Sequence, residues 1–235
     1  MNTSRMQLSI VIPTFNEASN MSRLLPYLRT HADATETEII VVNACKTTDD
    51  TAKIAQAEGA IVYTCMDCCR AAQMNLGASK ARFDTLYFVH ADVLPPSSFA
   101  EDIAQALAAG NVFGWFSYQF DSPSRLLKIN ARNTRRDGIF AGGGDQTLFI
   151  RKKDFQTLRG FRTDYRIMED FEFVKRAKRA GLPYTIVLHD VLVSARKYEQ
   201  NSYLKVNLVN LLMFGLFYLR CPQTWMKRIY KKFLR

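Results

Sequence analysis

The chain has 235 residues, of which 48% are hydrophobic and 23% are charged. These proportions are those of an ordinary globular protein that buries a core as one domain, or as one domain with an appendage. They argue against an integral membrane protein, because no run approaches the roughly 20 apolar residues that span a bilayer. The longest candidate, residues 206–219, is shorter and is interrupted by Asn207, Asn210 and Gly215.

The formal net charge of +10 is concentrated near the C-terminus. After Glu199 the chain has no acidic residue, and its basic residues there are Lys205, Arg220, Lys227, Arg228, Lys231, Lys232 and Arg235. This pattern indicates an anionic partner, and both membrane phospholipid and nucleic acid qualify. The five cysteines are odd in number and no secretory signal is apparent, so we expect free thiols in the cytoplasm.

Short apolar runs alternate with helical patterns in the first half of the chain. Strands are predicted at Gln7–Pro13, Glu38–Val42, Ala60–Tyr63 and Thr85–His90. Helices are predicted after Ser19, after the Thr47–Asp50 turn, over Arg70–Ala81 and over Ser98–Ala109. This alternation predicts βαβ units with parallel strands, so the residues that follow the strands are expected to line one crevice.

The second half is less regular. Strands are predicted at Val112–Phe120, Thr147–Ile150 and Thr185–Leu188, the last ending at His189, and a helix is predicted at Met168–Ala180. Between them, the glycine-rich loop AGGGDQ (residues 141–146) allows backbone to approach a ligand closely.

Asp92 stands just beyond the fourth predicted strand, in the stretch HADVLPP. A carboxylate at this edge of a parallel sheet can hold a hard cation against the phosphates of a ligand. Asp92 can equally cap the turn that precedes Pro95.

Several stretches in a fixed order carry a family resemblance: LSIVIPTFNE, EIIVVN with TTDDT, RAAQMNLGA, LYFVHAD, GGGDQTLFIRKKDF, GF and MEDFEF. From about Leu8 to about Glu199 the chain resembles the inverting, family-2-type glycosyltransferases of GT-A fold, in particular a bacterial subset of small, single-domain members. The resemblance implies a Rossmann-like, mostly parallel sheet flanked by helices over residues 1–200. A basic amphipathic helical tail over residues 201–235 is also typical of the subset.

The resemblance also implies roles for individual residues. A nucleotide-sugar donor would be bound by Pro13, Glu17, Asn43, Arg70 and Asn75. The sugar and acceptor would be bordered by Gly144, Asp145, Gln146 and Glu169. Asp92 would bind Mn²⁺ or Mg²⁺, with His189 as a further metal ligand, and Asp170 would be the general base.

The residue types fit this chemistry. A cation at Asp92, with Arg70 nearby, can stabilise the charge that develops on a nucleotide diphosphate leaving group. Asp170 can accept the proton of the attacking hydroxyl. One base without a protein nucleophile implies a single displacement with inversion.

Some positions depart from the family pattern, and others allow a purely structural role. Asn43 replaces an Asp that usually meets the base, so uridine is favoured but less firmly indicated. Lys46 can contact a phosphate or simply be solvated. Glu169 and Asp170 can also serve only to stabilise a helix N-terminus. Cys65, Cys68 and Cys69 could suggest zinc, but no second pair of ligands exists.

The tail can lie on an anionic membrane or pack on the domain as a helical hairpin with a solvated basic face. We expect peripheral contact with the cytoplasmic face of a membrane, and a lipid-linked molecule is a candidate for the unidentified acceptor. A non-catalytic nucleotide- or polyanion-binding module on the same fold is the alternative function. Nucleic acid is not expected as a partner, because acidic residues occupy the crevice.

Overall fold

The computed structural model describes residues 6–32, 36–67, 69–138 and 141–234. The strands are β1 (Leu8–Thr14), β2 (Thr37–Ala44), β3 (Ile61–Cys65), β4 (Thr85–Phe88), β5 (Val93–Leu94), β6 (Phe113–Phe120), β7 (Leu148–Arg151) and β8 (Tyr184–Val193). The helices are α1 (Ala18–His31), α2 (Thr51–Ala57), α3 (Arg70–Lys80), α4 (Phe99–Ala108), α5 (Arg125–Asn133), the 3₁₀ helix η1 (Gly144–Gln146), α6 (Lys152–Thr157), α7 (Glu169–Arg179), α8 (Arg196–Gln200), α9 (Tyr203–Tyr218) and α10 (Gln223–Phe233).

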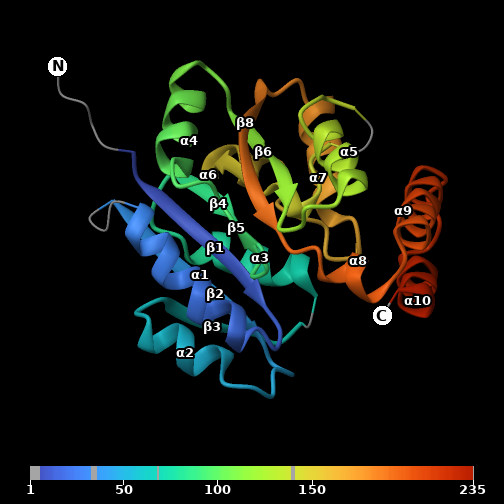
Figure 1. Ribbon diagram of the computed structural model, residues 1–235. Helices are drawn as coiled ribbons and strands as arrows, with labels where there is room; N and C mark the ends of the chain where they lie inside the picture. The colour runs from blue at the N-terminus through green and yellow to red at the C-terminus, as the bar shows by residue number, and fades with distance from the viewer. Residues whose placement is uncertain (1–5, 33–35, 68, 139–140, 235) are drawn as a thin grey trace.

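The strands form one mixed sheet in the order β3-β2-β1-β4-β7-β6-β8-β5 (Figure 1). Neighbouring strands from β3 to β4 are parallel, β7 is antiparallel to both β4 and β6, and β8 is parallel to β6. The first four strands therefore run in the same direction as β6 and β8. Their carboxyl ends share one edge, which is where ligands of open α/β sheets gather.

Alternate side chains of the central strands enter two cores, one on each face of the sheet. In β1, Val11 belongs to one core while Ile10 and Ile12 belong to the other. The period of two follows from strand geometry, in which successive side chains point to opposite faces. Helices α3, α6 and α7 cover the first core, and α1 and α4 cover the second, which explains why the central strands are buried on both faces.

The predicted α/β fold with a mostly parallel sheet is confirmed, and C-terminal helices follow it. Pro13 does not end the first strand, which continues to Thr14. The pairing of β1 with β4 stops at Val11, so the missing amide proton of Pro13 breaks no ladder bond on that side. Helices α5 and α6 and the short strand β5 were not predicted from the sequence.

The last two helices, α9 and α10, are separated at Cys221-Pro222 and form a third buried cluster with the body of the protein. Val206, Val209, Met213 and Phe217 of α9 pack with Met226 of α10. The partly buried side chains against this cluster include Tyr165, Ile167 and Met168, from the segment that leads into α7, and Phe171 in the first turn of that helix. In the described part of the chain, no helix is long and apolar enough to cross a membrane.

Candidate active site

The loops that follow β1 and β2 are tied together at the sheet edge. Thr48 N donates to Asn16 Oδ1 (2.9 Å), and Glu17 N donates to Thr51 Oγ1 (2.8 Å). Asn16 adopts a left-handed backbone conformation with φ 55°, which Asn tolerates better than most residues. These bonds fix the backbone at Asn16 and Glu17. Glu17, which was predicted to bind the nucleotide-sugar donor, is therefore held in place.

Asn43 ends β2 and is buried, with 7% of its surface exposed. Its Oδ1 accepts hydrogen bonds from Thr14 Oγ1 (3.0 Å) and Thr47 Oγ1 (2.8 Å). Because the amide oxygen serves two hydroxyls of the protein, the groups that Asn43 can offer to a base are N–H donors. An Asp at this position would instead offer a second acceptor oxygen.

Three carboxylates, Glu17 after β1, Asp92 after β4 and Asp145 in η1, are linked electrostatically through Asp92. The pKa of Glu17 is raised by burial and then by the charge of Asp92, although the hydrogen bond from Asn20 opposes the increase. Asp145 is an exposed residue, yet desolvation of its carboxyl by nearby protein atoms and then the Asp92 charge raise its pKa as well. Among the described residues Asp92 forms no ion pair. This surplus of negative charge fits a divalent cation.

A second group of charges lies at the start of α7. The Arg70 guanidinium forms an ion pair with Glu169 through Nε and Oε1, and its Nη1 lies 3.4 Å from His90 Nδ1. Burial lowers the pKa of Arg70, but the Glu169 and Asp170 carboxylates outweigh that effect and raise it. Arg70 still keeps 44% of its side-chain surface exposed, so part of its charge remains available to a ligand.

Asp170 is buried, and His90 Nε2 lies 3.9 Å from its Oδ2. Burial and then the neighbouring Glu169 charge raise the pKa of Asp170 to about 8, against the opposing effect of Arg70. Burial and Arg70 hold the pKa of His90 well below its usual range, so the imidazole is neutral. A carboxyl with a pKa near the working pH suits a general base.

Gly144 allows these groups to approach the backbone. A Cβ at this position would overlap the His90 ring and lie 2.6 Å from Asp170 Oδ2. Because glycine has no Cβ, the loop backbone can lie directly against the His90 imidazole and the Asp170 carboxylate.

Gln146 was predicted to border the sugar or acceptor, but the structure buries it, with 1% exposed. Its Oε1 accepts from Gly142 N (2.7 Å) and Gly143 N (3.3 Å), and its Nε2 donates to the carbonyls of Phe116 and Thr134. All of its polar groups are thus used inside the protein, and the residue shapes the glycine loop rather than touching a ligand.

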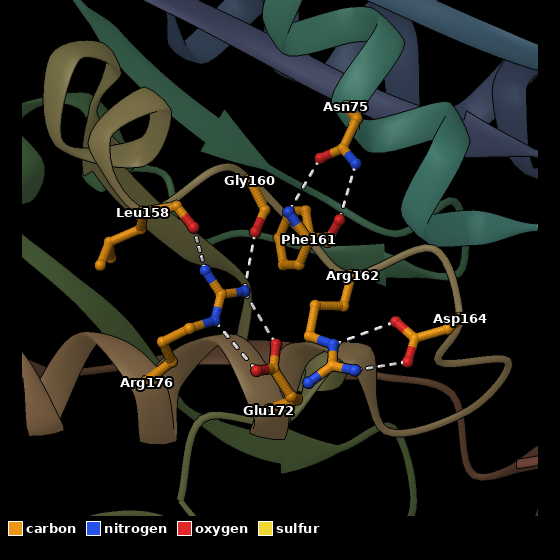
Figure 2. Close-up of polar contacts among 8 residues, drawn as sticks. All are labelled: Asn75, Leu158, Gly160, Phe161, Arg162, Asp164, Glu172 and Arg176. Atoms are coloured by element: carbon orange, nitrogen blue, oxygen red, sulfur yellow. Dashed lines mark hydrogen bonds and ion pairs between the residues drawn. The ribbon is translucent and has the colours of Figure 1, made fainter.

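Asn75 was predicted to bind the donor, and the structure again gives a different role. Its Nδ2 donates to Phe161 O (2.8 Å) and its Oδ1 accepts from Phe161 N (2.9 Å), which Figure 2 shows as a two-sided clamp. On the other side of the same loop, Arg176 of α7 contacts the Leu158 and Gly160 carbonyls and the carboxylate of Glu172. Asn75 therefore joins α3 to the loop that leads to α7.

His189 is not brought to Asp92. The sequence indicated a strand ending at His189, but β8 continues to Val193, and His189 Nδ1 bonds Asp102 Oδ1 (2.9 Å) on α4. Val193 pairs with Val93, the residue after Asp92, whereas His189 stands earlier in β8, where the pairing of β8 with β6 is irregular. The role of His189 as a metal ligand stays a prediction, and the bond to Asp102 gives it no support.

Arg196 and Lys197 stand where β8 actually ends, and the sequence reasoning missed them. The Arg196 charge partly opposes the rise in the pKa of Glu17, and the Lys197 charge partly opposes the rise in that of Asp145. Two basic residues just after an apolar run were a usable signal, but only once the end of the strand is placed correctly.

Two residues with left-handed backbone flank the remaining site elements. Thr147 (φ 50°) follows Asp145-Gln146, and Met168 (φ 61°) precedes Glu169-Asp170. Residues held in such conformations cost free energy and cluster at functional sites. Their positions agree with a site built from η1 and the start of α7.

The cysteines that the structure describes are not grouped into a metal centre. Cys69 caps α3, its Sγ accepting from Ala72 N (3.4 Å), while Cys68 lies outside the described residues. No three His, Cys, Asp or Glu side chains among the described residues are grouped as a ready-made metal site.

The mixed sheet and the carboxylates at its edge define an α/β protein of GT-A fold. The model of the family described as "Glycosyl transferase family 2" matches residues 9–166. Since the match covers more than half of the chain, the protein belongs to glycosyl transferase family 2. Comparison with curated proteins finds no match.

Solved structures share the fold at low identity. Mannosyltransferase PcManGT from Pyrobaculum calidifontis, in complex with GDP-Man and Mn²⁺, aligns with a TM-score of 0.69 and 16% identity over 98% of this chain and 70% of its own. Residues 1–349 of TarS from S. aureus, also solved with UDP-GlcNAc, give 0.65 and 17% over 97% and 70%. Glucosyl-3-phosphoglycerate synthase from Mycobacterium tuberculosis, in complex with Mn²⁺, UDP and glucosyl-3-phosphoglycerate, gives 0.65 and 16% over 92% and 81%.

Proposed function

We propose that the protein is a glycosyltransferase that moves a sugar from a nucleotide diphosphate sugar to an acceptor hydroxyl with inversion. The observation that carries the proposal is the buried Glu169–Asp170 pair, set against Arg70 and His90 and electrostatically linked through Asp145 to Asp92. The family match and the nucleotide-sugar complexes of PcManGT and TarS support the same donor class. Transfer of a hexosyl group is favoured on the same grounds.

On the donor side, the nucleotide lies against the loops after β1 and β2, which the Asn16–Thr48 and Glu17–Thr51 bonds hold rigid. UDP is the favoured diphosphate, as in the structures of TarS and the mycobacterial synthase. The exposed part of the Arg70 guanidinium is positioned to meet phosphate oxygens. An always-charged, planar donor stabilises the charge that develops on a phosphate leaving group.

A divalent cation, Mn²⁺ or Mg²⁺, fits the surplus of carboxylates around Asp92, which among the described residues lacks an ion-pair partner. Asp92 would hold the ion together with the diphosphate of the donor, since Mg²⁺ needs only one or two protein carboxylates. When bound, the ion would neutralise negative charge on the departing diphosphate. Its use in complexes of PcManGT and the mycobacterial synthase supports this assignment.

On the acceptor side, Asp170 takes the proton of the attacking hydroxyl. Its raised pKa keeps the carboxylate basic, and the approach of His90 and of the Gly144 backbone holds it in position. The hydroxyl oxygen forms the new glycosidic bond as the bond to the diphosphate breaks. A single displacement of this kind inverts the anomeric carbon.

The proposal is tested by isothermal titration of UDP, GDP and their sugar conjugates with and without Mn²⁺, followed by donor turnover. Asp92→Asn is expected to abolish the Mn²⁺-dependent part of nucleotide diphosphate binding. Unchanged binding and turnover in this variant would contradict the assignment of Asp92 as a metal ligand. Tight nucleotide binding without turnover of any sugar donor would favour the alternative of a non-catalytic nucleotide-binding module.

A further inference from the structure

Helix α9 is apolar on nearly all sides, although only one side packs on the protein. Val206, Val209, Met213 and Phe217 are buried in the third cluster. On other sides, Leu204, Leu208 and Leu211 are exposed by 71%, 65% and 59%, and Leu212 by 44%. We call these four leucines the leucine face. A helix that is hydrophobic all round normally has apolar surroundings on every side, so the leucine face needs a further partner.

Helix α5 lies beside α9 and carries exposed apolar side chains of its own. Asn130 of α5 donates to Asn207 Oδ1 (3.0 Å) and accepts from the Tyr203 hydroxyl (2.9 Å), which fixes the two helices against one another. Both lie on the same side of the molecule in Figure 1. Next to Asn130, Ile129 is 57% exposed, and Leu126 is 49% exposed.

The surroundings of the leucine face are strongly basic. The exposed basic side chains of α5 and α10 include Arg125, Lys128, Arg132, Arg228, Lys231 and Lys232. Trp225 and Phe233 of α10 are 63% and 43% exposed among them. No acidic residue follows Glu199, so nothing in this part of the sequence balances the charge.

We propose that the leucine face, with Leu126 and Ile129 of α5 and the cations of α10, docks onto one leaflet of a membrane that contains anionic phospholipid. Leucine side chains enter the boundary between headgroups and acyl chains, while lysine and arginine side chains meet the phosphates. A second copy of the chain fits less well, because its own basic residues would be brought against these. The contact is peripheral, since no helix among the described residues is long enough to span a bilayer.

Docking would also orient the site, if the proposed transfer is correct. The buried side of α9 and α10 packs on Tyr165, Ile167, Met168 and Phe171, which surround the start of the helix carrying Asp170. The base would thus be held close to the leaflet, on the side from which an acceptor attached to a lipid would arrive. This consequence rests on the proposed function, but membrane docking itself does not.

The test is flotation of the full chain with vesicles of phosphatidylcholine, alone or mixed with equal phosphatidylglycerol. Wild-type protein is expected to float with the anionic vesicles and to lose binding as salt is raised. The triple variant Leu204→Gln, Leu208→Gln, Leu211→Gln should bind about tenfold or more weakly, because apolar burial is lost. The matched control Ile61→Gln with Leu188→Gln, two exposed apolar residues elsewhere on the sheet, should bind like wild type.

A second variant, with Lys227, Arg228, Lys231 and Lys232 changed to Gln, should lose the preference for anionic vesicles while keeping its circular dichroism spectrum. Absence of flotation by folded wild-type protein would overturn the proposal, as would full binding by the triple leucine variant. If sedimentation shows a dimer that the leucine variant dissociates while flotation is unchanged, the leucine face is a subunit interface. UDP titration of the same samples distinguishes a failure of membrane docking from a failure of the proposed transferase function, because nucleotide binding does not depend on vesicles.

Discussion

Asp170, the proposed general base, is costly for the stability of the fold. It lies buried beside Glu169, and its pKa of about 8 means that the folded protein binds a proton more tightly than the unfolded chain does. The carboxyl therefore destabilises the fold increasingly as pH rises from about 4 to about 8.

Asp170→Asn is expected to remove turnover while leaving nucleotide binding intact. At pH 8 it should also raise the free energy of unfolding by about 1–3 kcal/mol, because the amide carries no buried charge. The gain in stability should vanish below about pH 4, where the Asp170 carboxyl of the wild-type protein is protonated in both the folded and the unfolded state. Urea unfolding at these two pH values measures the difference, and an active variant would end the assignment of Asp170 as the base.

The pH dependence of the reaction follows from the same group. A base must be deprotonated, so kcat/KM should rise about tenfold per pH unit up to about pH 8 and then level off. His90 does not contribute to this limb, because its lowered pKa keeps it neutral throughout. Steady-state rates between pH 6 and 9, with donor affinity measured at each pH, provide the test. A flat profile would contradict a base in this environment.

Gly144 is the residue whose substitution should separate chemistry from binding. A methyl group in Gly144→Ala would overlap His90 and lie 2.6 Å from the Asp170 carboxylate, so both must move. A displacement of about 1 Å at a catalytic group typically costs on the order of 100-fold in rate. We therefore expect kcat to fall by about that factor with little change in UDP affinity. Gly138→Ala, where an added Cβ meets nothing, is the control.

At the scale of elements, the clamp between α3 and the loop before α7 is formed by Asn75, which the sequence had suggested as a donor-binding residue. Asn75→Ala removes both bonds to the Phe161 backbone and should lower the free energy of unfolding by about 2 kcal/mol. Nucleotide affinity of the folded protein should change little. Ser79→Ala, on the exposed side of α3, is the control. Unchanged stability together with weaker UDP binding would instead support the predicted role of Asn75 in binding the nucleotide-sugar donor.

The elements themselves were largely predictable, because apolar strands buried on both faces and amphipathic helices leave distinct patterns. The patterns did not indicate which groups each side-chain amide would hydrogen-bond in the folded protein. Asn75 and Gln146 satisfy backbone groups that lie far away in the sequence, and such pairings depend on the finished fold. The end of β8 was missed for a related reason. His189 and Asp190 look like a strand end, but their partners on neighbouring elements let the strand continue to Val193.

At the scale of the whole molecule, helix α10 is joined to the body of the protein just before α7, the helix that carries the proposed base Asp170. Gln223 of α10 accepts hydrogen bonds through Oε1 from the amides of Arg166 (3.2 Å) and Ile167 (3.4 Å). Met226 beside it is completely buried. The helical tail is therefore part of the structure that positions Met168 and Asp170, whatever surface it also meets.

Deletion of residues 221–235 is thus expected to do more than release the protein from vesicles. Loss of the buried Met226 and of the Gln223 bonds should lower the melting temperature by several degrees, since burial of one such side chain contributes roughly 2 kcal/mol. Turnover of a soluble acceptor analogue should also fall, because the segment before Asp170 loses its support. The variant with the four α10 cations changed to Gln keeps Gln223 and Met226, and it should retain both stability and turnover. Differential scanning calorimetry and rates without lipid distinguish the two variants. A truncated protein with wild-type stability and turnover would show instead that the tail is an independent appendage, acting on the site only through the membrane.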